Sequence, residues 1–439
     1  MQKLKTAACC IGVFCVTLAA LLFMLILSAM IPNSAIQDNM LKSAFSYKDK
    51  DAFTFENGAA LNAISDNYAD TILLQLSMNM GRGAPLVSAL DTKYYDGESL
   101  GESIGFYLSL IDSDTEYNVD YTRYWHGSAM FIRLFHLFTD VDGIKLIGFA
   151  AVVLLALLAA AMLIKARHCD IAAVLILSSA AVSVWNVRLS LEYIPAFVIG
   201  YLMCVLYLFF ERKRDSFLIY LSVLGGVLIA FFDFLTCETV SILLPLVLVT
   251  AVRAKEKRLG ELKPNLILYF SCGAAWLLSY AATFVSKWTL ASLVTGENKL
   301  VTALSSAGER IAGDTSYLGF ESGIARIPLA LIANLSTIFG GEERIDVPHM
   351  LVGLALTAAV IFSVLYLFRS KQADQKCATV LLIILGSVIF GRYMMLNNHS
   401  LIHEFFTYRA LISSIAALLS AVLLNISLPV KKGGRGKLK

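Results

Sequence analysis

Residues 193–210 read YIPAFVIGYLMCVLYLFF, residues 211–215 read ERKRD, and residues 216–235 read SFLIYLSVLGGVLIAFFDFL. Each apolar run is close to the roughly 20 residues that a helix needs to cross the hydrocarbon core of a bilayer. The turn between them is rich in basic residues, and short basic loops stay on the cytoplasmic side of a membrane. This stretch therefore predicts two antiparallel transmembrane helices joined by a cytoplasmic turn.

The composition of the whole chain agrees with this interpretation. Of the 439 residues, 58% are hydrophobic and 16% are charged, which is typical of a membrane protein with many spans. The net charge of +3 is small, so the sequence argues against nucleic-acid binding. We predict an all-α integral membrane protein, a single polytopic domain over residues 1–439, with about ten transmembrane helices. The predicted spans are 7–31, 146–165, 172–189, 193–210, 217–235, 239–252, 266–285, 349–368, 377–395 and 409–428.

The basic residues set the predicted orientation in the cell membrane. With the N-terminus inside, the inner segments hold 20 of the 36 Lys and Arg residues but only 6 of the 33 acids. The positive-inside rule then places both termini in the cytoplasm. The first apolar run exceeds the ~7–15 residues of a secretory signal, so we expect an uncleaved signal-anchor helix. The inner segments are 1–6, 165–171, 211–216, 253–265, 369–376 and 429–439.

Two long segments are expected outside the membrane on the opposite side. The first extracytoplasmic loop, 32–145, contains turn-rich stretches and short helix-like stretches, and the second covers 287–348. Loops of this length are usually functional or packed onto the rest of the protein. No internal repeat is visible in the chain, so the inverted-repeat argument for a transporter has no basis here.

Polar residues that do not belong in a bilayer fall almost entirely on this outer side. An ionised side chain at the bilayer centre costs roughly 2.5–3.5 kcal/mol or more, so such residues are expected to gather in a protein-lined or water-filled space. Their one-sided distribution predicts chemistry or ligand capture at the outer leaflet. The residues are Asp66, Asp70, Arg123, His126, Arg188, Glu192, Asp233, Glu238, Lys287, His399, His403 and Arg409.

Asp66 and Asp70 are the predicted catalytic residues. They are four residues apart on a segment with helical spacing of apolar residues, so their like charges repel and one pKa is expected to rise. A carboxylate of this kind suits a general base that deprotonates a hydroxyl. The alternative is structural, because Ser65 and Asp66 are both good helix caps. We expect Asp70 to be the base, since it begins an apolar run that would pack and orient it.

The predicted substrate-binding residues are basic or acidic side chains beside the spans. His399 and His403 lie one helical turn apart and Arg409 follows, a set that suits a phosphate or pyrophosphate group. The same two imidazoles also have the spacing of metal ligands, but no third ligand is evident, so no metal site is predicted. The carboxylates of Asp66 and Asp70 would also suit a metal, so a divalent cation stays open as a cofactor. Arg188 and Glu192 are expected to form an ion pair. Further predicted substrate-binding residues are Arg123, His126, Asp233 and Glu238.

Four short motifs resemble those of bacterial multi-pass proteins related to the GT-C superfamily of membrane glycosyltransferases. They are NYAD at 67–70, YWHG at 124–127, FDFLT at 232–236 and NHSxxHxxFTYR at 398–409. The resemblance implies a polyprenyl-phosphate sugar donor and a catalytic acid on the first outer loop, matched here by Asp66 and Asp70. The chain departs from the common pattern because no Asp-Asp or Asp-x-Asp stands just after the first span. The Asp-x-Asp at 49–51 lies in a Lys-rich, polar setting typical of a solvated loop.

These observations favour an inverting glycosyltransferase that moves a sugar from a polyprenyl-phosphate donor to a glycan, lipid or protein acceptor on the extracytoplasmic side. A transporter or flippase is one alternative, which predicts charged residues throughout the membrane depth. A lipid-linked glycan polymerase or ligase is another, which would use outer Arg and His residues without a base on the first loop.

Overall fold

The computed structural model is mostly helical, and its strands are four short segments in two antiparallel pairs, among the residues that it describes. Six helical stretches are long and apolar enough to cross a membrane: Leu4–Ala29, Val141–Lys165, Leu191–Phe210, Leu262–Thr295, Gln375–Met395 and Glu404–Asn425. The structure describes residues 2–56, 58, 60–96, 107, 115–312, 326–341, 347–348, 351–355, 358–359 and 373–425.

A membrane-embedded helical protein is thus supported, whereas the predicted number of about ten spans is not confirmed. Most of the predicted span 349–368 lies outside the described residues. Three other predicted spans correspond to shorter helices, α8 (Cys169–Ala181), α10 (Ser216–Phe232) and α11 (Val240–Lys255). The predicted spans and the observed helices therefore differ mainly in helix length.

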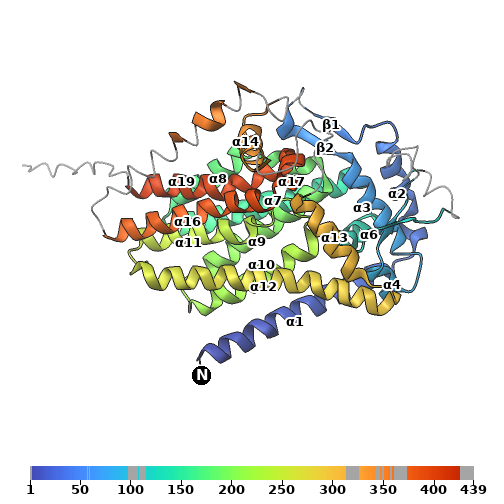
Figure 1. Cartoon of the computed structure of the whole chain (residues 1–439), viewed down its shortest axis with the longest axis horizontal. Coiled ribbons are helices and arrows are strands. Elements are labelled where there is room, and N and C mark those ends of the chain that lie inside the picture. The colour runs from blue at the N-terminus through green and yellow to red at the C-terminus, as the bar shows by residue number, and fades with distance from the viewer. Residues whose placement is uncertain are drawn as a thin grey trace, which may run out of the picture.

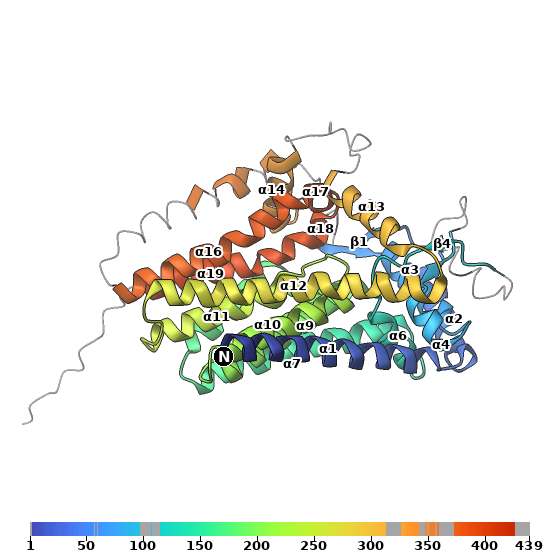
Figure 2. The same ribbon diagram turned by 60° about the horizontal axis from the view of Figure 1, so that its bottom comes forward.

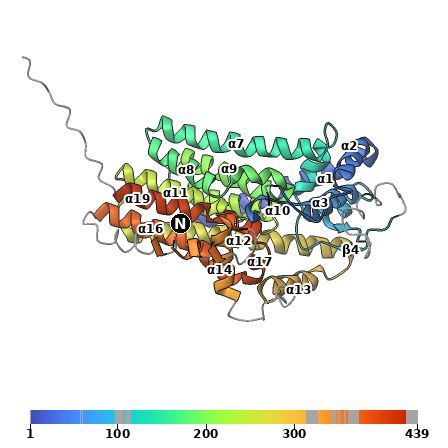
Figure 3. The same ribbon diagram turned by 90° about the horizontal axis from the view of Figure 1, so that it is seen from above.

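The long helices run side by side, and the first-loop elements gather at one end of the bundle (Figures 1 and 2). Seen from above, α7 (Val141–Lys165) lines one edge, while α13 (Lys299–Ala312) and α14 (Arg326–Thr337) lie on the opposite one (Figure 3). The other bundle helices are α1 (Gln2–Ala29), α9 (Ile194–Phe210), α12 (Leu262–Thr295), α16 (Ala373–Met395) and α19 (Ile412–Asn425).

α11 lies in the core of the helix bundle. Every residue from Val240 to Arg253 is buried, and a helix that is apolar on all sides is enclosed by other helices. Close packing elsewhere depends on small residues: a Cβ atom at Gly226 of α10 would lie 2.4 Å from the carbonyl oxygen of Trp276 on α12. Small residues at such contacts let membrane helices approach closely.

The first loop folds into short elements that cover one end of the bundle. These are α2 (Asn33–Tyr47), β1 (Phe53–Phe55), β2 (Ile64–Asp66), α3 (Asn67–Asn79), α4 (Pro85–Leu90), β3 (Lys93–Tyr94), β4 (Val119–Asp120) and α6 (Ser128–Phe135). Near them lie the 3-10 turns η1 (Leu61–Ala63), η2 (Val184–Leu189) and η3 (Leu191–Tyr193) and, toward the C-terminus, α17 (Asn397–Ile402), α18 (Glu404–Thr407) and η5 (Tyr408–Leu411). We call this the loop end, and the end with turns 211–215 and 253–261 the basic end.

Candidate functional site

At the loop end, both carboxylate oxygens of Asp70 are fully occupied by hydrogen bonds and an ion pair. Its Oδ1 accepts hydrogen bonds of 2.7 Å each from the Ser190 hydroxyl and the Leu191 backbone N–H. Its Oδ2 accepts one of 2.7 Å from the Tyr47 hydroxyl and lies 2.6 Å from Nζ of Lys145. The side chain is fully buried. Because Asp70 joins α2, α3, α7 and η3 through both oxygens, its geometry suits an anchor for the first loop.

Asp66 is the N-cap of α3, as the alternative interpretation of the sequence predicted. Its Oδ1 accepts a hydrogen bond of 2.8 Å from the backbone N–H of Ala69. Burial raises the pKa of Asp66 to about 7, although the hydrogen bonds from Ala69 and Glu192 act in the opposite direction. The carboxyl group is therefore able to gain and lose a proton near neutral pH.

Glu192 is the second member of this pair. Its buried carboxyl group forms a hydrogen bond with that of Asp66, which requires one proton between the two groups. Its Oε1 is buried and has no hydrogen-bond partner. Arg188 is exposed and is not paired with Glu192, so the predicted ion pair between them was wrong: η2 turns Arg188 outward while η3 turns Glu192 inward.

Arg409 lies between the first loop and the C-terminal helices, and only 1% of it is exposed. Its guanidinium donates hydrogen bonds of 3.2 Å to the backbone carbonyls of Asn62 and Phe405. It also lies over the rings of Tyr193 and Tyr408, at 4.7 and 5.0 Å from their centroids. Its Nε has no partner, and no carboxylate of the described residues pairs with it. A buried cation without a carboxylate is a candidate anion site.

The turn from α10 to α11 holds the other two predicted acids in place. Asp233 accepts hydrogen bonds from the backbone N–H of Thr236, at 3.0 Å, and from its hydroxyl. Glu238 forms a two-pronged ion pair with Arg392 of α16, with distances of 2.9 and 3.1 Å. Both acids therefore have structural partners that shape this turn. Sequence reasoning missed Arg392, although an arginine near the end of a predicted span was a signal for it.

The predicted histidines adjoin the same turn. His399 is within hydrogen-bond distance, 3.0 Å, of the carbonyl oxygen of Leu235, a residue with a φ of +67°. The rings of His399 and His403 lie 4.7 Å apart, and His403 stacks on Phe406 at 5.1 Å. Within the part of the chain that the structure describes, no three metal-binding side chains cluster, so these imidazoles have no third ligand there.

Arg123 and His126 lie on the far side of the turn, in an aromatic cluster. His126 is within 2.7 Å of the Tyr121 carbonyl and 5.2 Å from the Phe234 ring. Burial lowers the pKa of His126 to about 3, so the imidazole is neutral at pH 7. The Arg123 guanidinium lies 4.3 Å above the Tyr121 ring. The backbone at Gly127 approaches α10 closely, and its N–H donates a hydrogen bond of 2.9 Å to the Phe231 carbonyl.

The structure thus brings the predicted site residues together in three groups. Asp66, Asp70 and Glu192 form the first. The second lies around the turn from α10 to α11 and contains Asp233, Glu238, His399 and His403, and the third is the aromatic cluster with Arg123 and His126. Glu192 lies within electrostatic range of Asp233. Arg409 joins the C-terminal segment to the loop that precedes Asp66. Lys287 stands apart, because its buried ammonium group donates to the carbonyls of Ala89 and Leu90 at the end of α4.

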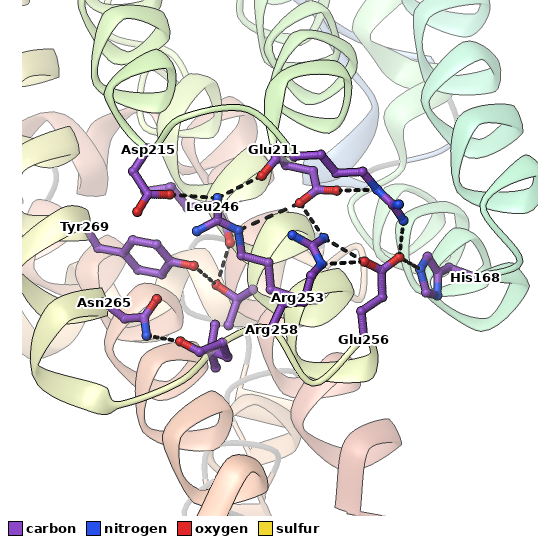
Figure 4. Close-up of polar contacts among 12 residues, drawn as sticks. His168, Glu211, Asp215, Leu246, Arg253, Glu256, Arg258, Asn265 and Tyr269 are labelled. Atoms are coloured by element: carbon purple, nitrogen blue, oxygen red, sulfur yellow. Dashed lines mark hydrogen bonds and ion pairs between the residues drawn. The ribbon is translucent and has the colours of Figure 1, made fainter.

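The basic end contrasts with this arrangement (Figure 4). Glu211 pairs with Arg258 at 2.6 Å and with Arg212 at 3.2 Å, and Asp215 pairs with Arg253 at 3.0 Å. Glu256 joins Arg258 at 2.7 Å and His168 at 3.1 Å. Three segments that the sequence predicted to be cytoplasmic therefore meet at one end of the bundle.

No protein-family model, curated protein or solved structure matches this chain. The function of the protein is therefore inferred from the geometry of these residues.

Proposed function

We propose that the protein is a membrane glycosyltransferase that transfers a sugar from a polyprenyl-phosphate donor to an acceptor hydroxyl at the loop end. The observation that carries the proposal is the buried carboxyl pair of Asp66 and Glu192 close to a buried arginine. Tyr193 follows Glu192 in the chain, and its ring is covered by the Arg409 guanidinium, which has no carboxylate partner among the described residues. A proton acceptor and a cation are the two groups that this reaction needs. The resemblance of the four sequence motifs to GT-C proteins agrees with it.

Asp66 is the proposed base. In its deprotonated form the carboxylate accepts the proton of the acceptor hydroxyl while that oxygen attacks the anomeric carbon. The bond between the anomeric carbon and the phosphate oxygen breaks, and the electron pair leaves with the polyprenyl phosphate. A single displacement of this kind inverts the configuration at the anomeric carbon. The proton remains on the carboxyl pair until it passes to water.

Arg409 is the proposed partner of the leaving phosphate. Negative charge grows on that phosphate in the transition state, and a fixed guanidinium stabilises it most where water is excluded. Its Nε is the donor without a partner. We assign Asp70 to positioning, because its pair with Lys145 holds α3, and therefore Asp66, against the bundle.

The alternative of a transporter receives less support. The middle sections of α9, α10, α11 and α19 contain no charged residue, whereas the ionisable groups lie toward the two ends of the bundle. A path for an ionic solute through the membrane would require polar groups along its depth.

Reconstituted protein and a panel of radiolabelled polyprenyl-phosphate sugars test the proposal. We expect one donor to lose its label to an acceptor with wild-type protein and not with Asp66→Asn. Asparagine caps helices as well as aspartate, so the variant should remain folded. Asp51→Asn, an exposed acid of the same loop, is the matched control. Equal transfer by Asp66→Asn and wild type would refute the assigned base.

A further inference from the structure

An apolar surface of the first loop lies beside the ends of the membrane helices. Phe131 and Leu134 of α6, with Phe138 just after it, follow one another at intervals of three and four residues and so share one face. All three are exposed, Phe138 to 78%. Leu86 and Val87 of α4 are exposed as well. We call these five side chains the apolar collar.

The single charge of the two helices points away from this surface. α4 and α6 contain one ionisable residue, Arg133, and it is fully buried. Its guanidinium donates hydrogen bonds of 2.9 Å to the Ser28 carbonyl and to Oδ1 of Asn33, and also binds the Ile31 carbonyl. Helix C-termini leave such carbonyls without partners, so Arg133 caps the end of α1. The collar therefore presents no charge to its surroundings.

The collar continues the exposed apolar surface of the long helices. α1 packs against both α4 and α6, and Phe23 and Leu27 of α1, with Met30 just after it, are exposed. α7 follows α6 in the chain and leaves Leu146 and Ile147 exposed. Figure 2 shows α1 running toward α4 and α6. A soluble partner would cover a bounded patch, whereas this surface merges with helices of membrane-spanning length.

We propose that α4 and α6 lie in the membrane interface, with the apolar collar inserted at the boundary between headgroups and acyl chains of the leaflet at the loop end. Short helices with one apolar face occupy this depth, about 5–10 Å below the headgroups. The proposal does not depend on the proposed enzymatic function.

The collar is firmly connected to the candidate site. The Phe131 ring stacks on that of Phe232 at 5.7 Å, and the backbone N–H of Gly127 donates to the Phe231 carbonyl at 2.9 Å. Asp233 follows directly in the chain. A collar at headgroup depth would hold the site at the level where the phosphate of a lipid-linked substrate lies.

Tryptophan fluorescence in vesicles tests the proposal. Phe138→Trp would be reconstituted into phosphatidylcholine vesicles whose acyl chains are brominated either near the headgroup or near the bilayer centre, and the wild-type signal would be subtracted. We expect the shallow bromines to quench roughly half of the added fluorescence and the deep ones clearly less, as the interfacial depth requires. Leu134→Trp repeats the test in case the first variant does not fold.

The matched control is Phe55→Trp, on the exposed β1 strand away from α1 (Figure 1). It should be quenched by aqueous iodide and not by brominated lipid. Iodide quenching of Phe138→Trp equal to that of the control would place the collar in water and overturn the proposal. Protection from both iodide and bromine would show that protein covers the collar, and would overturn it as well.

Discussion

The two ends of the helix bundle differ in how their buried charged side chains are paired. At the basic end each buried or half-buried acid has a basic partner, as with Glu211 and Arg258 (Figure 4). Nε of Arg253 is buried there without a hydrogen bond, but it lies within ion-pair distance of Glu211, at 3.8 Å. At the loop end Oε1 of Glu192, Nε of Arg409 and Nδ1 of His126 are buried without partners. An unpaired buried polar atom costs about 1–3 kcal/mol, so it is retained where a ligand supplies the partner. The difference points to the loop end as the place of function and to the basic end as structural.

The largest expected effect is on stability and comes from Asp70. Asp70→Asn removes the charge from a buried pair and leaves Lys145 without its carboxylate, so we expect a loss of about 3–5 kcal/mol in the free energy of unfolding. Denaturant titration in detergent measures it, with Asp51→Asn as the control. Unchanged stability together with lost transfer would instead make Asp70 the base, as the sequence analysis expected.

The next effect concerns the proposed anion site. Arg409→Lys keeps the charge but removes Nε and the planar group that stacks on Tyr193 and Tyr408. We expect kcat/KM for the lipid-phosphate donor to fall about 10- to 100-fold, or roughly 1.5–3 kcal/mol. His399→Ala and His403→Ala are expected to act in the same direction. Arg212→Lys, at an exposed residue of the basic end, is the control and should transfer normally.

The acidity of the Asp66 pair predicts a pH dependence. With the pKa of Asp66 raised to about 7, transfer should fall tenfold per pH unit below that value, because the base is then protonated. Folding binds this proton more tightly than the unfolded chain does. The carboxyl therefore stabilises the fold fully below pH ~4, and this contribution is lost as the pH rises through about 7. Thermal unfolding should therefore show wild type losing stability relative to Asp66→Asn as the pH rises from 5 to 8, because asparagine does not titrate. A difference between the two proteins that stays constant over this range would refute the assignment.

The sequence predicts the basic end better than the loop end, for a physical reason. Apolar runs and the ERKRD turn are local patterns, so helices α9 and α10 and their common turn appear where expected. The predicted count of about ten spans is not confirmed, and α11 shows why apolar length alone does not decide it: this helix of 16 residues is buried among its neighbours.

The site depends on contacts between distant parts of the chain. Asp66 contacts Glu192, and Glu238 contacts Arg392, only in the folded protein. Neither pair can be predicted from the spacing of residues in the sequence. The predicted partner of Glu192 was Arg188, the nearest opposite charge in sequence. The 3-10 turns between α8 and α9 separate the two, which helical periodicity cannot reveal.

The smallest expected effect is at the basic end, and it tests the contrast from the other side. Glu211→Gln removes a buried carboxylate that binds Arg258 at 2.6 Å and lies 3.8 Å from Nε of Arg253. Each arginine keeps another acid, Glu256 for Arg258 and Asp215 for Arg253, so neither is left as an isolated charge. We therefore expect a loss of about 1 kcal/mol in unfolding free energy, decreasing at high salt, with donor transfer within about twofold of wild type. A Glu211→Gln protein that unfolds like wild type yet no longer transfers sugar would place part of the function at the basic end, and the distinction between the two ends would fail.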